Sequence, residues 1–264
     1  MAPREFETIL AAKAGKALRI TMNRPQVHNA FNAKMIGELA DAFITARSDD
    51  GIRVVVLTGA GASFCAGADL NWMREIIQYS YEQNLAESRQ VAELMKAIYE
   101  LPKPTIARVN GAVIGGGTGL LSACDIVVAS DKARFGLSEV KIGLVPAAIG
   151  PYVIRRIGEN HAHELFLTGE RFDSRRALEI GLTNKVVPHE ALDEKVDEIV
   201  RLLLSSGPEA IAKCKELLYK VPGMSLEEAK GYTAEMIARL RISPEGQEGM
   251  ASFLEKRKPR WTEE

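Results

Sequence analysis

Hydrophobic and polar positions alternate over short stretches in the first two thirds of the chain, and this pattern predicts strands separated by helices. Residues 6–12 and 17–22, with a turn near Gly15, predict a β-hairpin. Residues 54–57 (Val-Val-Val-Leu) form a continuous apolar run, which is typical of a strand buried on both faces. Two further short runs follow the same plan, at residues 105–109 and 125–129.

Helical periodicity separates these strands. Apolar residues from Met35 to Ile44 recur at helical spacing after Asn32, which is a suitable N-cap residue. Residues 72–100 predict a second, long helical stretch. Short buried strands that alternate with helices indicate an α/β fold.

The last quarter of the chain is predicted to be helical. Ser225 and Glu228 stand three residues apart and fit a capping box at the start of a helix. We expect a core domain over residues 1–195 and a helical C-terminal subdomain over residues 196–264, whose apolar stripe packs on the core or on another subunit. The helices expected in it cover residues 208–221, 225–242 and 244–258.

Composition and charge narrow the class of protein. The 264 residues are 46% hydrophobic and 26% charged, which is typical of a folded chain with one large domain. The formal net charge of −1 favours neither nucleic acid nor an anionic membrane as a partner. Residues 1–10 lack the apolar core of a secretory signal, so we expect no such signal. Glycines interrupt the charge-free run 109–124, so we expect no membrane-spanning helix there. Three widely spaced cysteines are typical of reduced thiols, so we expect a cytoplasmic protein.

A first glycine-rich loop, residues 59–70 (Gly-Ala-Gly-Ala-Ser-Phe-Cys-Ala-Gly-Ala-Asp-Leu), follows a predicted strand and precedes a predicted helix. A dinucleotide-binding fingerprint would need a third glycine at Phe64, and a phosphate-binding loop would need Lys followed by Ser or Thr. Two interpretations remain. The loop is a tight turn with Asp69 as a helix N-cap, or backbone N–H groups near Gly67 and Ala68 donate to an oxyanion.

A second glycine-rich loop, residues 111–119 (Gly-Ala-Val-Ile-Gly-Gly-Gly-Thr-Gly), also follows a predicted strand. Three consecutive glycines destabilise a regular element, so they indicate either close helix–sheet packing or a backbone that approaches a ligand. If one N–H group from each loop met the same oxygen, the pair would stabilise the enolate of a thioester.

Glu139 is the candidate proton carrier for such chemistry. It lies in the largely apolar segment 133–146, and an apolar setting raises the pKa of a carboxyl group. The alternative is a surface glutamate paired with Lys141. His161 and His163 are spaced like a metal-binding pair, but their polar neighbours favour an exposed helix face, so we expect no metal site.

Several motifs, taken in order, resemble the enoyl-CoA hydratase/isomerase (crotonase) family. They are Asn29-Ala-Phe-Asn32, Phe64-Cys-Ala-Gly-Ala-Asp-Leu70, Asn110-Gly-Ala-Val-Ile-Gly-Gly-Gly117, Cys124-Asp125, Phe135-Gly136, Glu139 and Gly143-Leu-Val-Pro146. The resemblance covers nearly the whole chain and implies a spiral of ββα units followed by a helical region that builds homotrimers, usually paired into hexamers. It also implies an acyl-CoA thioester substrate, with coenzyme A as part of the substrate and no separate cofactor.

The resemblance also implies roles for residues at matching positions. The N–H groups of Ala68 and Gly116 would form the oxyanion hole, and Glu139 would exchange a proton with the acyl α-carbon. Phe253 and Lys256 would reach the CoA of a neighbouring subunit. The remaining substrate-binding positions, which would hold the adenine and bent pantetheine or line the acyl pocket, are Ala66, Ala68, Asp69, Leu70, Asn71 and Met73.

Two positions depart from the hydratase pattern of that family. Gly119 stands where the glutamate that helps to activate water is expected, and residues 147–154 replace the usual Gly-Ala-Gly-Gly-Thr-Gln-Arg-Leu. Both departures resemble a bacterial subgroup similar to methylglutaconyl-CoA and carboxygeranoyl-CoA hydratases, which act in leucine and acyclic terpene breakdown. A single glutamate is equally the pattern of Δ3,Δ2-enoyl-CoA isomerases.

The resemblance therefore implies hydration of a 2-enoyl-CoA, with a branched, methylglutaconyl-like chain as one option, in fatty acid metabolism or leucine degradation. The alternatives are an isomerase that uses Glu139 alone and an acyl-CoA binder with little activity. One relative of these hydratases binds RNA through a lysine-rich helix. Residues 33–50 here carry Lys34 and Arg47 against four acidic residues, so we expect no nucleic-acid binding.

Overall fold

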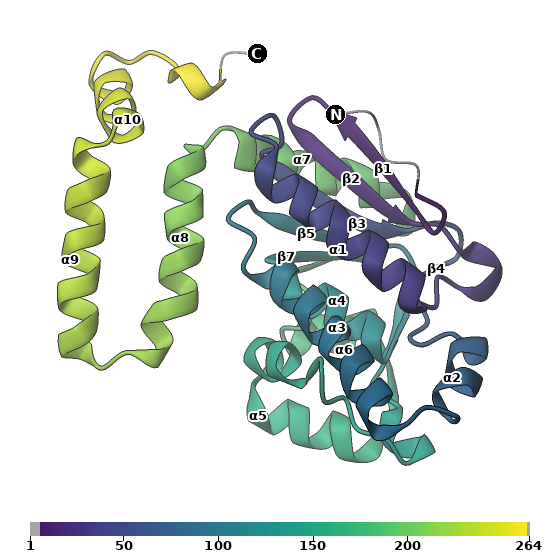
Figure 1. The fold of residues 1–264 in the computed structure, drawn as a ribbon. Helices are drawn as coiled ribbons and strands as arrows, with labels where there is room; N and C mark the ends of the chain where they lie inside the picture. The colour runs from purple at the N-terminus through teal and green to yellow at the C-terminus, as the bar shows by residue number, and fades with distance from the viewer. Residues whose placement is uncertain (1–5, 263–264) are drawn as a thin grey trace.

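The computed structural model describes residues 6–262, which form a body of two β-sheets covered by helices and a separate helical arm (Figure 1). Residues 1–5, part of the segment expected to carry no secretory signal, and residues 263–264 lie outside the described residues. Within the described range, no helix is long and apolar enough to cross a membrane.

The main sheet has six strands in the order β1-β2-β3-β5-β7-β10. β1 and β2 form the predicted antiparallel hairpin, and Gly15 at its turn has a positive φ of 56°. The other neighbouring strands pair in parallel. In chain order, these strands cover Ile9–Ala14, Ala17–Met22, Val54–Gly59, Thr105–Val109, Ile126–Ser130 and Lys185–Val187.

β3 is buried along its whole length, as its continuous apolar run predicts. Val55 and Leu57 belong to the larger hydrophobic core. Val54 and Val56 belong to a second core, which they share with side chains of α7 (Leu192–Leu204). Because side chains alternate between the two faces of a strand, helices must cover both faces of the main sheet here.

The second sheet has four short strands in the order β4-β6-β8-β9. β4, β6 and β8 pair in parallel, whereas β9 is antiparallel to β8. Each of the first three follows a strand of the main sheet and precedes a helical segment, so the body is a series of ββα units, which confirms the expected fold. The four strands cover Ser63–Cys65, Ala112–Ile114, Arg134–Gly136 and Arg171–Asp173.

The helices of the body begin at capping residues that the sequence supplies. The Asn32 side chain accepts a hydrogen bond from Met35 N–H at 3.0 Å at the start of α1. The predicted single helix over residues 72–100 is wrong, because Ser80 and Gln83 form a capping box that begins a new helix. The α-helices before α7 are α1 Ala33–Ser48, α2 Leu70–Ile76, α3 Tyr81–Tyr99, α4 Gly116–Ala123, α5 Gly150–Thr168 and α6 Ser174–Glu179. Short 3-10 helices cover Pro25–Val27 (η1), Glu139–Ile142 (η2), His189–Ala191 (η3), Val221–Gly223 (η4) and Arg260–Thr262 (η5).

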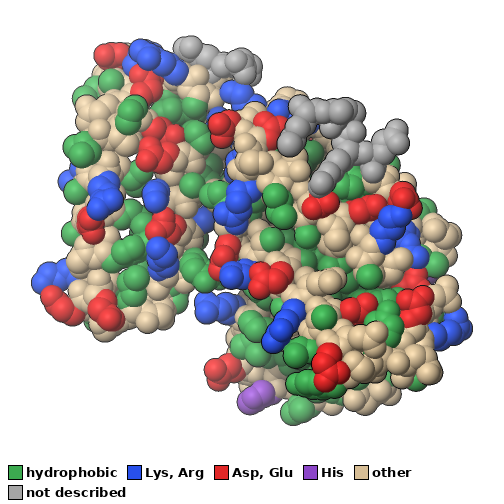
Figure 2. Space-filling model, viewed as in Figure 1, with side chains coloured by type: hydrophobic (Ala, Val, Ile, Leu, Met, Phe, Trp, Pro, Cys, Tyr) green, Lys and Arg blue, Asp and Glu red, His purple; other side chains and the backbone are tan. Residues whose placement is uncertain are grey.

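The arm consists of α8 (Pro208–Lys220), α9 (Leu226–Ile242) and α10 (Pro244–Leu254); it extends from one side of the body in Figure 1, and α8 contacts the body, for example through the ion pair of Lys215 with Asp125. The predicted capping box of Ser225 and Glu228 begins α9. Figure 2 shows hydrophobic side chains at the surface of the arm between charged ones. α7, which spans the predicted boundary at residues 195 and 196, packs on the main sheet, so the arm begins with α8.

Candidate active site

The first glycine-rich loop leads from β4 into α2 and leaves one amide without a partner. Phe31 N–H donates to Gly67 O at 2.8 Å, and Asp69 N–H donates to Phe31 O at 3.0 Å. Successive amides of an extended segment point to opposite sides, so the N–H of Ala68 points away from Phe31. The described part of the chain offers this N–H no hydrogen-bond acceptor.

The capping interpretation of this loop is confirmed. The Asp69 side chain accepts from Asn71 N–H at 2.7 Å and from the Arg24 guanidinium at 2.6 Å. Burial alone would raise the pKa of Asp69, but these hydrogen bonds and the Arg24 charge outweigh it and lower that pKa. Asp69 therefore stays charged near neutral pH, and a negative charge at this end stabilises α2.

The second glycine-rich loop turns from β6 into α4. Gly115 has φ 52° and ψ −122°, a conformation open to glycine but not to other residues without strain. Gly116 is the first residue of α4, where a backbone N–H has no partner inside the helix, and none of the described residues accepts a hydrogen bond from it. Gly117 instead permits close packing, because a Cβ atom there would lie 2.5 Å from Cys65 O. The loop thus combines close packing with an unpaired amide.

The two loops touch, and Glu139 lies beside them. A Cβ atom placed on Gly67 would lie 3.0 Å from Ile114 O, so the first loop rests on the second. A Cβ atom placed on Gly115 would lie 3.1 Å from Oε1 of Glu139. One region of the body therefore contains two unpaired amides, one from each loop, and a carboxyl group.

The Glu139 carboxyl is neither a surface charge nor part of an ion pair. Burial raises its pKa, as the apolar segment around it predicts, although a backbone hydrogen bond opposes the rise. Its Oε2 atom is buried without a hydrogen-bond partner among the described residues. Lys141 is not among the groups that shift the pKa of Glu139, and no ion pair joins the two in that same part of the chain, so the surface-pair alternative is wrong. A half-buried carboxyl with a raised pKa is suited to general acid–base chemistry.

Ile149 fills the space beside Gly119. A Cβ atom on Gly119 would lie 2.1 Å from Ile149 Cγ2, and Ile149 itself is 3% exposed. The two departures from the family pattern, at position 119 and at residues 147–154, therefore meet in space. Gly115, the N-cap residue of α4, therefore lies beside a carboxyl group, and Gly119 inside the helix lies beside an apolar side chain.

The remaining predicted positions of the first loop lie at the start of α2. Leu70 is 71% exposed and Asn71 is also exposed. Ala66 and Met73 are half-buried. These residues are close in sequence to Ala68, whose N–H is unpaired. No contact within the described residues shows which of them would bind a ligand.

Phe253 and Lys256 are not brought to Glu139 within one chain. Phe253 is 83% exposed on α10, and Lys256 follows the end of that helix. Figure 1 shows α10 at the end of the arm, away from α2 and α4. Their expected role through a neighbouring subunit stays a prediction.

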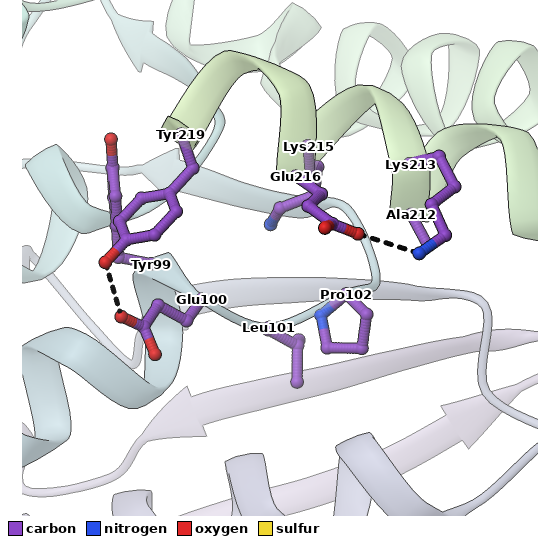
Figure 3. Close-up of a pocket in the computed structure, with 9 residues that line it drawn as sticks. All are labelled: Tyr99, Glu100, Leu101, Pro102, Ala212, Lys213, Lys215, Glu216 and Tyr219. Atoms are coloured by element: carbon purple, nitrogen blue, oxygen red, sulfur yellow. Dashed lines mark hydrogen bonds and ion pairs between the residues drawn. The ribbon is translucent and has the colours of Figure 1, made fainter. Parts of the chain in front are cut away.

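A groove of about 310 Å³ between α3 and α8 (Figure 3) is a separate place with different chemistry. Tyr219 OH donates to Glu100 at 3.0 Å, and Lys213 Nζ donates to Glu216 at 2.8 Å. These polar groups satisfy each other, so the groove offers no counterpart to the unpaired groups beside Glu139.

Other reactive side chains do not form a second site. Burial raises the pKa of the Cys65 and Cys124 thiols to about 12, so neither supplies a thiolate near neutral pH. His163 is exposed and His161 is half-buried on α5. In residues 6–262 no three His, Cys, Asp or Glu side chains form a group that could hold a metal ion.

Sequence reasoning missed two residues that shape this region. In the sequence, Phe31 stands out only as part of a motif, and Ile149 only as part of a segment that departs from the family pattern. Their positions depend on contacts between distant parts of the chain. The one signal for Ile149 was that residues 147–154 and Gly119 both depart from the same family pattern.

Comparisons with known proteins show which family the chain belongs to. A family model described as enoyl-CoA hydratase/isomerase matches residues 13–264. The crystal structure of an enoyl-CoA hydratase from Shewanella pealeana has a TM-score of 0.95 and 39% sequence identity, covering 98% of this chain and 97% of that one. The short-chain-enoyl-CoA hydratase of Clostridium acetobutylicum is 33% identical over 260 residues, covering 96% of this chain and 97% of its own length. The trans-2-decenoyl-(acyl-carrier-protein) isomerase of Streptococcus mutans is 30% identical over 263 residues, covering 98% and 99%. The chain therefore belongs to the enoyl-CoA hydratase/isomerase family, the crotonase family, and is an enzyme of that family.

Proposed function

We propose that this enzyme hydrates a 2-enoyl-CoA thioester to the 3-hydroxyacyl-CoA. The observation that carries the proposal is the meeting of two glycine-rich loops, each with an unpaired amide, beside the half-buried Glu139. The N–H groups of Ala68 and Gly116 would hold the thioester oxygen. Because charge grows on that oxygen as the enolate forms, two preorganised donors favour the transition state over the bound substrate.

Glu139 would carry the proton. Its raised pKa favours the acid form, which donates its proton to Cα. The oxygen of a water molecule bonds to Cβ as the carbon–carbon π bond breaks, and the proton lost by this water returns to the Glu139 carboxylate. The reaction then adds one water molecule to the substrate and leaves Glu139 in its starting state.

The proposal extends to the rest of the substrate. Backbone at Ala66, Asp69 and Leu70, with Asn71 beside them, would hold the CoA portion, and Met73 would line the acyl pocket. A branched, methylglutaconyl-like acyl chain, and hence a place in leucine degradation, is the narrower form of this proposal. Its support is the pair of departures at Gly119 and residues 147–154.

Isomerisation of a 3-enoyl-CoA to a 2-enoyl-CoA is the second candidate. The contact between Gly119 and Ile149 favours it, because an apolar group fills the space at position 119, where the family's water-activating glutamate is expected, and Glu139 is the one carboxyl left to move protons. In that reaction the Glu139 carboxylate would remove a proton from one carbon and return it to another, with no water consumed. An acyl-CoA binder with little activity is the third candidate, and the same apolar contact supports it.

One mass-spectrometric panel separates these candidates. The enzyme would be incubated with crotonyl-CoA, 3-methylglutaconyl-CoA and a 3-enoyl-CoA, and each product would be read by mass and by conjugated-thioester absorbance. Hydration adds the mass of one water, isomerisation changes absorbance at constant mass, and a binder changes neither. Glu139→Gln tests the proton carrier, and Glu159→Gln, at an exposed glutamate on α5, is the matched control. Equal turnover in both variants would remove Glu139 from the mechanism.

We also propose that the active form is a homotrimer or a hexamer. α8 and α9 contain no fully buried residue in the described chain, and Leu226 and Ile242 at the ends of α9 are 92% and 79% exposed. A second copy would cover such residues and would bring Phe253 and Lys256 to a neighbouring site. Light scattering tests this, and a monomeric mass at working concentration would contradict it.

A further inference from the structure

Phe31 touches both glycine-rich loops through different parts of itself. Its backbone N–H donates a hydrogen bond to Gly67 O at 2.8 Å, and its backbone C=O accepts one from Asp69 N–H at 3.0 Å. Gly67 and Asp69 are the two neighbours of Ala68 in the chain. This pair of bonds fixes the plane of the segment that carries the Ala68 N–H. The backbone of Phe31 therefore sets the direction of the first unpaired amide.

The ring of Phe31 lies against the second loop. A Cβ atom on Gly116 would lie 2.1 Å from Cζ and 2.9 Å from Cε1 of Phe31. Real Cβ atoms do not approach other carbons so closely, so the ring rests directly on the glycine backbone. The side chain of Phe31 therefore limits where the second unpaired amide lies.

The ring has little room to withdraw. Trp72 packs against it, with ring centroids 6.2 Å apart and planes inclined at 60°. Trp72 is 7% exposed, and its Nε1–H donates to Oε1 of Glu87 at 3.0 Å. Phe31 itself is 4% exposed. The buried Phe31 ring packs against an indole that is itself held by a hydrogen bond, so its position is restricted.

We propose that Phe31 is a positioning residue that sets the separation and direction of the Ala68 and Gly116 amides. The inference rests on the proposed function, in which both amides hold one thioester oxygen. Phe31 acts through the two loops and donates nothing to the substrate. If the ring moves, the Gly116 amide moves relative to the Ala68 amide, and the oxygen loses one of its two donors.

The first test measures how strongly the two amides polarise the thioester carbonyl, with no reaction taking place. The enzyme would be saturated with butanoyl-CoA carrying 13C at the thioester carbonyl, and the infrared carbonyl stretch would be compared with that of the free thioester. Two donors lower the stretching frequency by polarising the bond. Phe31→Leu is expected to reduce this shift and to lower kcat by tenfold or more, with KM changed less than threefold.

A matched control separates positioning from general loosening of the core. Phe43 on α1 is 1% exposed and lies in the same hydrophobic core, and it is not among the nearest neighbours of a Cβ atom placed on Gly67 or Gly116. Phe43→Leu is expected to lower the melting temperature while leaving the carbonyl shift at the wild-type value. Equal carbonyl shifts in Phe31→Leu and wild type would overturn the inference.

The second test uses the clash between the ring and position 116. Gly116→Ala is expected to reduce kcat by about 10²–10³, the loss typical of one misplaced oxyanion donor. In the Phe31→Leu background the added methyl group meets a smaller side chain. The factor by which Gly116→Ala lowers kcat is therefore expected to be at least tenfold smaller there than in the wild type. Equal losses in both backgrounds would contradict contact between the ring and this amide. A wild-type enzyme that binds the thioester with no carbonyl shift would overturn the proposed function itself.

Discussion

Gly115, the N-cap residue of α4, and Gly119, inside that helix, lie beside neighbours of opposite character. Gly115 faces the Glu139 carboxyl, with 3.1 Å between Oε1 and a Cβ atom placed on the glycine. Gly119 faces Ile149, with 2.1 Å between Cγ2 and the corresponding Cβ atom. In both places the absence of a side chain on α4 gives space to a group from another part of the chain.

Of these two neighbours, only the one beside Gly115 can titrate. The group at Gly115 can gain and lose a proton, and its pKa is raised by burial. The group at Gly119 can do neither, and its branched carbon lies too close to admit a side chain on α4. The proposed chemistry assigns the proton to Glu139, and the predictions below change one neighbour at a time.

The largest effect is expected where the carboxyl is removed. Glu139→Gln keeps the shape of the side chain but cannot donate or accept the proton, so kcat should fall by about 10²–10⁴. This corresponds to about 3–5 kcal/mol of transition-state stabilisation. Steady-state rates on the accepted enoyl-CoA measure it, with Glu159→Gln as the control. A loss of less than twofold would place the proton carrier elsewhere.

The next effect is expected at the apolar neighbour. Ile149→Ala removes a buried side chain and leaves a cavity beside Gly119, so the free energy of unfolding should fall by about 2–5 kcal/mol. Urea unfolding followed by circular dichroism measures the change. Because Ile149 carries no proton, kcat on the folded enzyme should change far less than in Glu139→Gln. A kcat loss as large as that of Glu139→Gln would mean that Ile149 shapes the reaction itself.

A smaller effect is expected from adding a methyl group to the helix. Gly119→Ala places a Cβ atom inside the Ile149 side chain, and such overpacking destabilises a core by about 1–3 kcal/mol. In the Ile149→Ala background the same methyl enters the new cavity and should stabilise the protein. The four variants form a double-mutant cycle in the free energy of unfolding. Strict additivity would show that the two positions do not touch.

The smallest effect is expected from pH. The folded protein holds the Glu139 proton to a higher pH than the unfolded chain does, since burial raises its pKa. Its contribution to stability is therefore full below the ordinary glutamate pKa of about 4.3 and is lost as the pH rises through the folded pKa. Wild type should lose stability over this interval relative to Glu139→Gln, which does not titrate. Parallel pH profiles would contradict a raised pKa.

The kcat should also change with pH as Glu139 titrates, and the direction of the change depends on the reaction. Hydration begins with the acid form of Glu139, so its kcat should fall as the pH rises through the raised pKa. Isomerisation begins with the carboxylate, so its kcat should rise over the same interval. The pH profile of kcat thus distinguishes the two candidate reactions in one enzyme.

The strands were predictable from local pattern, whereas the neighbours of α4 were not. A strand that is buried on both faces has apolar residues at every position. The continuous apolar run 54–57 therefore predicts such a strand, and β3 is buried along its whole length. The predicted helix 72–100 failed because Ser80 and Gln83 bond each other's backbone, a local signal that the apolar pattern hides. Glu139 was found from its apolar segment and its motif. Ile149 and Phe31 act through contacts across the sheets, and no spacing along the chain encodes those contacts.

The most direct measurement is a crystal structure of the enzyme with a bound acyl-CoA thioester. The thioester oxygen should lie about 2.7–3.1 Å from the backbone nitrogens of both Ala68 and Gly116, with the Glu139 carboxyl next to Cα. An oxygen that contacts only one of these nitrogens, or an α-carbon out of reach of Glu139, would contradict the account.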